Sequence, residues 1–187
     1  ARADTMLDRS RPHGRSSGHL RPTAGDASTA HYWLMRRDLG PTLDDPGWPA
    51  AVRPAEFTAQ NAPLVHQLLV LGREHGGGRV ADYPAWLDAF ETDPECDRAL
   101  CFVLEDALGV AAVAQCWTSA FIRNLVVHPR ARNQGLGLTL LDQVFKAFRQ
   151  RGEAHVDLKV MESNLGARRL YERAGMQYIQ RNELEPR

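Results

Sequence analysis

Residues 126–137 are the part of this chain whose residue types most directly suggest chemistry. They read VVHPRARNQGLG and lead from a β-branched pair, through a proline turn, into a loop that opens an amphipathic helix. Backbone N–H groups at a helix start have no partner inside the helix, and the positive end of the helix dipole lies there, so anions bind at such positions. Gly135 and Gly137 let a ligand approach this backbone closely. The segment therefore predicts a site for the pyrophosphate of a nucleotide-like cofactor.

The loop differs from two well-known nucleotide-binding motifs. It lacks the Gly-Lys-Ser/Thr of a Walker A loop, and its G-x-G-x-x-G pattern is incomplete. Binding of a phosphate group is supported, whereas binding of a triphosphate is not. Because helix packing on a sheet also favours Gly at a strand-to-helix turn, the loop alone is a weak signal.

A second group of residues follows downstream. It consists of Asn164, Ala167, the run Leu170-Tyr171-Glu172, and Gly175 before Met176. Together with the loop at residues 132–137, this order resembles the GNAT superfamily of N-acetyltransferases, whose pyrophosphate loop reads Gln/Arg-x-x-Gly-x-Gly/Ala. The resemblance covers residues 51–184 and is strongest over residues 121–176. Residues 31–49 look like the junction found in tandem members of the superfamily such as mycothiol synthase.

The resemblance implies a strand at residues 121–127 that splays away from a strand at residues 155–160. The space between them would hold the pantetheine arm of acetyl-CoA, which serves as the co-substrate. The resemblance implies no metal cofactor. The backbone groups expected to pair with this arm belong to Leu125, Val126 and Val127, where an N–H would polarise the thioester carbonyl. The main-chain N–H groups expected around the pyrophosphate belong to Arg132, Asn133, Gln134, Gly135, Leu136, Gly137 and Leu138.

Two side chains of the following helix receive roles from the same resemblance. Tyr171 would be the general acid that protonates the coenzyme A thiolate, and Asn164 would hydrogen-bond the arm. Periodicity alone offers another interpretation, because Tyr171 shares a helical stripe with Leu170 and Ala174, and Asn164 is a helix-capping residue type. The agreement of both motifs favours the catalytic interpretation of Tyr171.

The general base is not marked by a carboxylate. Many relatives place a Glu near the start of the splayed strand, but residues 122–124 read Ile-Arg-Asn here. A water relay to Glu105, His128 or Glu162 could remove the proton, although each is also an ordinary surface residue type. Arg123 could instead select an acidic acceptor.

Composition limits the partners. The 187 residues suffice for one domain, and Lys plus Arg equals Asp plus Glu at 23 each, so no net field favours nucleic acid or membrane. We expect a small-molecule or peptide amine as acceptor. No apolar run approaches the roughly 18 residues that span a bilayer, and no secretory signal is written, so the cytoplasm is the default compartment. Cys96, Cys101 and Cys116 lack metal-ligand spacing and are expected to be reduced core residues.

The pattern along the chain divides it into three parts. Residues 1–30, rich in Arg, Ser, Gly and Pro, predict a flexible tail. Residues 31–49 contain an apolar strand at 31–39 and a proline-rich linker, and residues 50–187 form the acetyltransferase-like domain.

The spacing of apolar residues predicts the elements of the domain. Strands are expected at residues 51–55, 100–105, 110–118, 121–128, 155–160 and 176–184, and helices at 61–73, 83–90, 135–151 and 164–174. A meander before a βαβ-like unit predicts an α/β fold with a mixed sheet, of the GNAT-like acyl-CoA N-acyltransferase type with an extra N-terminal strand.

The position of that extra strand follows from the other end of the chain. The last strand ends near Leu184, where many relatives add another one. We therefore expect residues 31–39 beside the sheet of their own chain or of a second copy, and the second arrangement would form a homodimer.

The function expected from this sequence is transfer of an acetyl group from acetyl-CoA directly to a primary amine. A non-catalytic acyl-CoA-binding regulatory module is the alternative, kept open by the missing carboxylate near Arg123. A third hypothesis is a fragment of a tandem enzyme, in which Tyr32 and Trp33 leave an apolar patch that needs a partner.

Overall fold

The structure is a computed structural model, and it describes residues 29–41, 45, 47–73 and 79–185. Nearly all of the tail expected at residues 1–30 lies outside the described residues. The elements in chain order are β1 (His31–Asp38), β2 (Arg53–Ala55), α1 (Ala62–Arg73), α2 (Tyr83–Thr92), β3 (Cys96–Asp106), β4 (Gly109–Trp117), β5 (Phe121–Val127), a 3-10 turn η1 (Pro129–Ala131), α3 (Leu136–Gln150), β6 (His155–Met161), α4 (Leu165–Arg173) and β7 (Gln177–Glu183). The helices and strands expected from the sequence are present, although β3 begins earlier and β2 later than expected.

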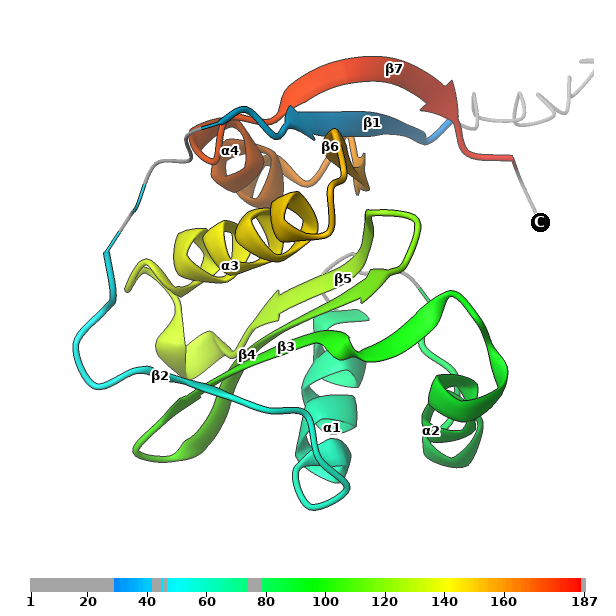
Figure 1. Cartoon of the computed structure of the whole chain (residues 1–187). Coiled ribbons are helices and arrows are strands. Elements are labelled where there is room, and N and C mark those ends of the chain that lie inside the picture. Colours follow the sequence, from blue (N-terminus) through cyan, green and yellow to red (C-terminus); the bar gives the residue numbers. More distant parts are fainter. Residues whose placement is uncertain (1–28, 42–44, 46, 74–78, 186–187) are drawn as a thin grey trace, which may run out of the picture.

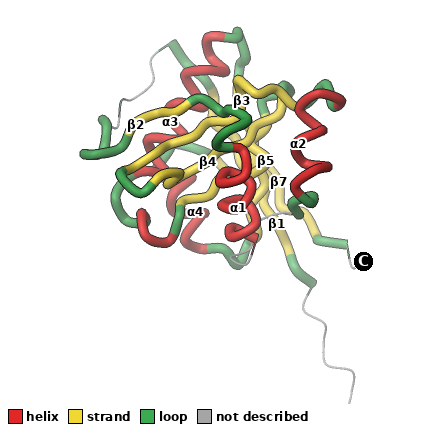
Figure 2. Tube along the Cα trace, turned by 90° about the horizontal axis from the view of Figure 1, so that it is seen from below, coloured by secondary structure: helices red, strands yellow, loops and turns green. Residues whose placement is uncertain are grey.

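The strands form a seven-stranded sheet in the order β2-β3-β4-β5-β6-β1-β7. Neighbouring strands are antiparallel except β5 and β6, which are parallel. On one face α1 packs against β4 and β5, and α2 packs against β3 (Figure 2). Helix α3 covers the opposite face (Figure 1). This mixed sheet between helices confirms the predicted fold class.

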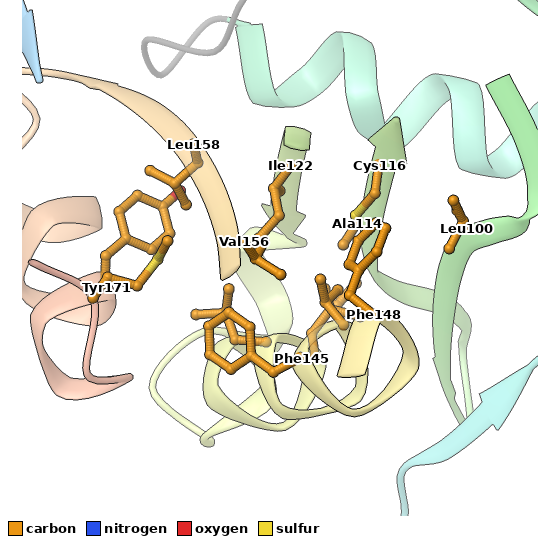
Figure 3. Close-up of a cluster of buried hydrophobic side chains, with 14 of the residues drawn as sticks. Leu100, Ala114, Cys116, Ile122, Phe145, Phe148, Val156, Leu158 and Tyr171 are labelled. Carbon is orange, nitrogen blue, oxygen red and sulfur yellow. The ribbon is translucent and has the colours of Figure 1, made fainter. Parts of the chain in front are cut away.

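Each face of the sheet buries its own apolar cluster. The apolar stripe of α3, including Leu140, Phe145 and Phe148, packs against strand residues such as Ile122 and Val156 (Figure 3). On the other face, side chains of α1 and α2 meet those of β3 and β4 in a second cluster. Because full burial of one such side chain contributes about 2 kcal/mol, the two clusters hold both sides of β5 firmly in place.

The N-terminal strand β1 lies inside the sheet, between β6 and β7, and is antiparallel to both (Figure 1). The expectation that this strand joins the sheet of its own chain is therefore confirmed. Arg36 donates hydrogen bonds of 2.7 and 2.8 Å to Asp157 of β6, and Arg37 donates one of 3.0 Å to the carbonyl of Ala174, at the end of α4. The sheet thus includes residues 31–38, although the sequence pattern separates them from the domain that begins at residue 50.

Docking of β1 also tests the apolar patch expected at Tyr32 and Trp33. Tyr32 and Trp33 are both half-buried. The ring of Trp33 meets Tyr178 of β7 edge-on at 4.9 Å between centroids, and the Lys159 ammonium lies 5.3 Å from the Tyr32 ring centre. The expected apolar patch is therefore wrong, because the chain covers these rings itself.

Two smaller expectations concern cysteines and membrane segments. Cys96, Cys101 and Cys116 are buried and free, which confirms them as reduced core residues. In the part of the chain that the structure describes, no helix has the length and apolarity needed to cross a membrane.

Candidate functional site

Strands β5 and β6 pair only where they start. Their parallel register joins Phe121 to Asp157 and Ile122 to Leu158, and no further pair follows. On its other side β5 pairs with β4 as far as Val127. Residues 123–127 therefore have no strand partner on the side of β6, and we call this stretch the unpaired edge of β5. The splay implied by the resemblance is present.

A β-bulge separates the paired and unpaired parts of β5. The register with β4 shifts between Gln115 and Cys116, which leaves Arg123 as the extra residue. The side chains confirm the shift, because Ile122 and Leu125 both lie in the α3-side cluster although they are three positions apart. The bulge thus changes which residues of β5 point toward β6.

The direction of the backbone groups follows from two hydrogen bonds at the ends of β5. Before the bulge, the carbonyl of Ala120 accepts from the N–H of Asp157 at 3.0 Å, on the β6 side. After it, the N–H of His128 donates to the carbonyl of Ala111 at 2.7 Å, on the β4 side. Since backbone groups alternate along a strand, those of Leu125 and Val127 point away from β4, into the unpaired edge. The backbone of Val126 points toward β4 instead.

The turn after β5 is held by two polar contacts. His128 caps η1, its Nδ1 accepting from the N–H of Arg130 at 3.2 Å. Partial burial, together with the charges of Arg130 and Arg132, holds the pKa of His128 below its ordinary value. Arg130 in turn donates to Asp106 of β3 at 2.9 Å, and this hydrogen bond keeps the pKa of Asp106 low. The loop is therefore anchored to β3.

The loop itself presents free backbone N–H groups. Asn133 and Gly135 have φ of +60° and +82°, whereas Gln134 between them does not, and such alternation turns successive N–H groups toward one side. The N–H groups of residues 133–138 have no acceptor among the described residues, and the first turn of α3 has no side-chain cap. This concave set of donors at a helix start fits a phosphate group.

Glycine is needed at the two positions of the loop for different structural reasons. Gly135 adopts the left-handed conformation, which costs most other residues free energy. Gly137 lies against α4, since a Cβ there would stand 2.8 Å from Leu170 Cδ2. Only Gly135 therefore shapes the loop itself, and Gly137 allows α3 and α4 to approach each other.

Helix α4 brings Tyr171 to the point where β5 and β6 separate. Its ring extends toward Leu158, which belongs to the last registered pair of the two strands (Figure 3). Tyr171 is only 8% exposed, and burial raises its pKa to about 12. Its hydroxyl group has no hydrogen-bond partner among the described residues. A protonated donor without a partner in the described part of the chain therefore lies in the core next to Leu158 of β6 (Figure 3).

Asn164 caps α4 in the way its residue type suggests. Its Oδ1 accepts from the N–H of Ala167 at 3.2 Å. The capping interpretation is thus correct, and it leaves the Nδ2 group without a partner in the described part of the chain. Both interpretations of Asn164 remain compatible with this geometry.

The three residues considered for proton removal are engaged elsewhere. Glu105 accepts from Arg53 at 2.8 Å, and Glu162 accepts two bonds of 2.8 Å from Arg181, which lowers the pKa of Glu162. His128 uses its Nδ1 within η1.

A cavity of about 560 Å³ opens on the α1 and α2 side of β5, and none of these three residues lines it. It is lined by Arg73, Arg79, Val80, Ala81, Asp82 and Arg123. A narrower extension of about 50 Å³ shares Arg79 and Arg123 and reaches Gln115 and Asn124. Sequence reasoning singled out Arg123 but missed Arg79 and Asp82, which lie far from both motifs and before an ordinary helix start.

One of the three cysteines, Cys96, lines the narrow extension of the cavity, and burial is the main cause that raises its pKa. No group of three or more His, Cys, Asp or Glu side chains within the described ranges is arranged to hold a metal ion. Burial raises the pKa of Cys101 to about 12 and that of Cys116 well above its ordinary value. Both thiols therefore stay protonated and unreactive at neutral pH.

Known proteins share this fold. The acetyltransferase (GNAT) family model matches residues 65–176. Among solved structures, a GCN5-related N-acetyltransferase from Sphaerobacter thermophilus is 25% identical, with a TM-score of 0.68, over 84% of this chain and 53% of that one. The ribosomal-protein-S18-alanine N-acetyltransferase of Escherichia coli is 24% identical, with a TM-score of 0.51, over 66% of this chain and 76% of that one.

A third solved structure contains a ligand. It is a predicted acetyltransferase with acetyl-CoA from Clostridium acetobutylicum, 14% identical, with a TM-score of 0.51, covering 67% of this chain and 90% of that one. A comparison with curated protein sequences finds no match. Since the chain spans about half the length of the Sphaerobacter protein, that likeness concerns only part of the longer chain.

Proposed function

This chain belongs to the acetyltransferase (GNAT) family, and from that premise we propose that it transfers an acetyl group from acetyl-CoA directly to an amine. The observation that carries the proposal is the unpaired edge of β5, which leads straight into the loop of free N–H groups. One site pairs with an extended chain and the other with an anion. Coenzyme A offers the matching groups in the same order, because its extended pantetheine arm is followed by a pyrophosphate.

The unpaired edge of β5 supports binding of the arm through main-chain groups. The backbone groups of Leu125 and Val127 point into it, and they would pair with the amides of the arm as a neighbouring strand would. Val126 is a weaker candidate, because its backbone faces β4. The side chains of β5 pack into the two clusters and so hold this edge rigid.

The loop supports binding of the pyrophosphate. Main-chain N–H groups of residues 133–138 would donate to its oxygens, and the start of α3 would add the helix dipole. Arg132 is exposed, and its Nε reaches the carbonyl of Val127 at 3.4 Å, so its positive charge stays close to the loop. The backbone shapes this loop, through the left-handed φ values of Asn133 and Gly135.

The chemical roles of the chain's own residues follow from this placement. Bound acetyl-CoA supplies an acyl group activated as a thioester. A main-chain N–H at the unpaired edge would polarise its carbonyl, as fixed donors do where negative charge develops. Tyr171 keeps its proton at all physiological pH values and would give it to the departing sulfur. Direct transfer to the amine is favoured, because burial raises the pKa of all three cysteines, including Cys96 in the narrow extension, and so keeps their thiols protonated.

The test combines binding with turnover. Calorimetric titration with coenzyme A should give saturable heat, and release of free thiol from acetyl-CoA should require both an amine and Tyr171. Absence of heat and of thermal stabilisation at millimolar coenzyme A would overturn the proposal. Binding without thiol release across a broad panel of primary amines would favour the alternative, a regulatory module that binds acyl-CoA.

A further inference from the structure

The cavity beside α2 meets β5 at the bulge. Arg123 is the bulged residue, and Arg123 together with Asn124 lines the narrow extension. The bulge is also where β5 loses its pairing with β6. A molecule in this cavity would therefore approach the unpaired edge of β5 from the face opposite α3. At about 560 Å³, the cavity has the volume of a typical small-molecule site.

The lining of the cavity carries mainly positive charge, although the chain as a whole has no net charge. Among the described residues, Arg73, Arg79 and Arg123 line the cavity together with one carboxylate, Asp82. None of the three arginines forms an ion pair with another described residue, and Arg123 only lies 5.2 Å over the ring of Trp117. Asp82 precedes α2 but makes no side-chain capping bond. Guanidinium groups without a carboxylate partner are suited to bind an anion.

A buried polar side chain faces the same space. Gln115 is only 3% exposed, and its Oε1 accepts from the indole N–H of Trp86 at 3.0 Å. This bond fixes the orientation of the amide, and the Nε2 group has no partner among the described residues. Because Gln115 lines the narrow extension, its free N–H donors face the cavity. The cavity thus holds a built donor in addition to its surface arginines.

We propose that this cavity binds an acceptor whose molecule carries, besides its amine, an anionic group held by Arg79 and Arg123. The inference rests on the proposed function and names the class of acceptor for it. The anionic group is a carboxylate or a phosphate, since both accept paired hydrogen bonds from a guanidinium. Asp82, the only carboxylate among the described lining residues, attracts the ammonium end and so orients the molecule.

The transfer is balanced within this arrangement. The amine nitrogen forms a bond to the acyl carbon, and the bond from that carbon to sulfur breaks. The ammonium nitrogen loses two protons in all, one to solvent before the attack and one to Asp82 after it, and the sulfur gains one from Tyr171. Solvent returns a proton to Tyr171 and removes one from Asp82, so neither residue is changed by a turnover.

The experiment compares matched amines on the protein saturated with coenzyme A. The pairs are glycine with glycinamide and O-phosphoethanolamine with ethanolamine, and binding is followed by calorimetry before turnover with acetyl-CoA is measured. We expect the anionic member of at least one pair to bind about tenfold more tightly. Preference within the first pair identifies a carboxylate, and preference within the second a phosphate.

Two variants make the result specific to the cavity. Arg123→Gln should abolish the preference, whereas Arg149→Gln, which changes an exposed arginine of α3 away from the lining, should keep it. Equal affinity within both pairs, or a preference that Arg123→Gln retains, would overturn the inference. Failure of the proposed function is distinguishable, because it is measured by coenzyme A binding and by turnover, not by the ratio between paired amines.

Discussion

The two sides of β5 recognise ligands in different ways. On the side of α3 and α4, the proposed cofactor site consists mainly of main-chain groups from one short stretch, residues 125–138. On the side of α1 and α2, the proposed acceptor site consists of side chains from separate elements, among them Arg73, Asp82 and Arg123. Main-chain recognition tolerates exchange of side chains, whereas side-chain recognition does not. The first site can therefore stay constant in a family while the second changes.

Tyr171 belongs to the side of α3 and α4, and its change should have the largest effect. Tyr171→Phe removes only the hydroxyl group, so we expect a loss of about 100-fold or more in kcat with little change in coenzyme A affinity. The matched control is Tyr178→Phe, since Tyr178 is bonded to Glu172 and Arg168 outside the site. Full turnover of Tyr171→Phe would remove the assignment of the acid.

Gly135→Val tests the main-chain side directly. A β-branched residue is strained at φ +82°, so the loop must rearrange and its N–H groups lose their common direction. We expect coenzyme A to bind about 30-fold more weakly, from roughly 2 kcal/mol of strain. Gly152→Val is the control, because Gly152 also has a φ of +82° but lies at the other end of α3. Equal loss of affinity in both variants would contradict main-chain recognition by this loop.

Asp82→Asn tests the side-chain side. Removing the charge while keeping the shape should lower kcat/KM for the amine by about tenfold and leave coenzyme A binding unchanged. Asp88→Asn is a matched change on the exposed face of α2. If Asp82→Asn weakened coenzyme A binding instead, the division between the two sides of β5 would not hold.

The anchor of the loop on β3 predicts a pH dependence of stability. The hydrogen bond from Arg130 lowers the pKa of Asp106 in the folded state, so the carboxylate stabilises the fold above its ordinary pKa. This contribution, about 1 kcal/mol, is lost as the pH falls through the lowered pKa. The free energy of unfolding should therefore differ between wild type and Asp106→Asn near pH 7, and the difference should shrink toward pH 3. A difference that stays constant with pH would show that the ion pair contributes nothing.

The smallest effect is expected for a side chain inside the loop. Gln134 is exposed, and its side chain forms no hydrogen bond with another described residue, so Gln134→Ala should change coenzyme A affinity by less than about twofold. Calorimetry measures this alongside Gly135→Val. A large loss would show that side chains, and not only N–H groups, bind the pyrophosphate.

Local patterns predicted much of the fold and of the cofactor side. The stripe of α3 and the strands before it follow from the periodicity of apolar residues, which the packed sheet then satisfies. The loop after β5 could be identified because its donors are consecutive in the chain. The bulge at Arg123 was not foreseen, since it depends on the register with β4 and not on residue type.

By itself, the sequence determined the elements, the mixed α/β class, the loop proposed to bind an anion and the position of Tyr171 on its helix, because each depends on neighbours within one stretch of chain. Only the tertiary structure decided that β1 enters the sheet between β6 and β7, and that Arg79, Asp82 and Arg123 line one cavity. Such groupings depend on strand order and helix packing. These bring together residues that no local pattern connects.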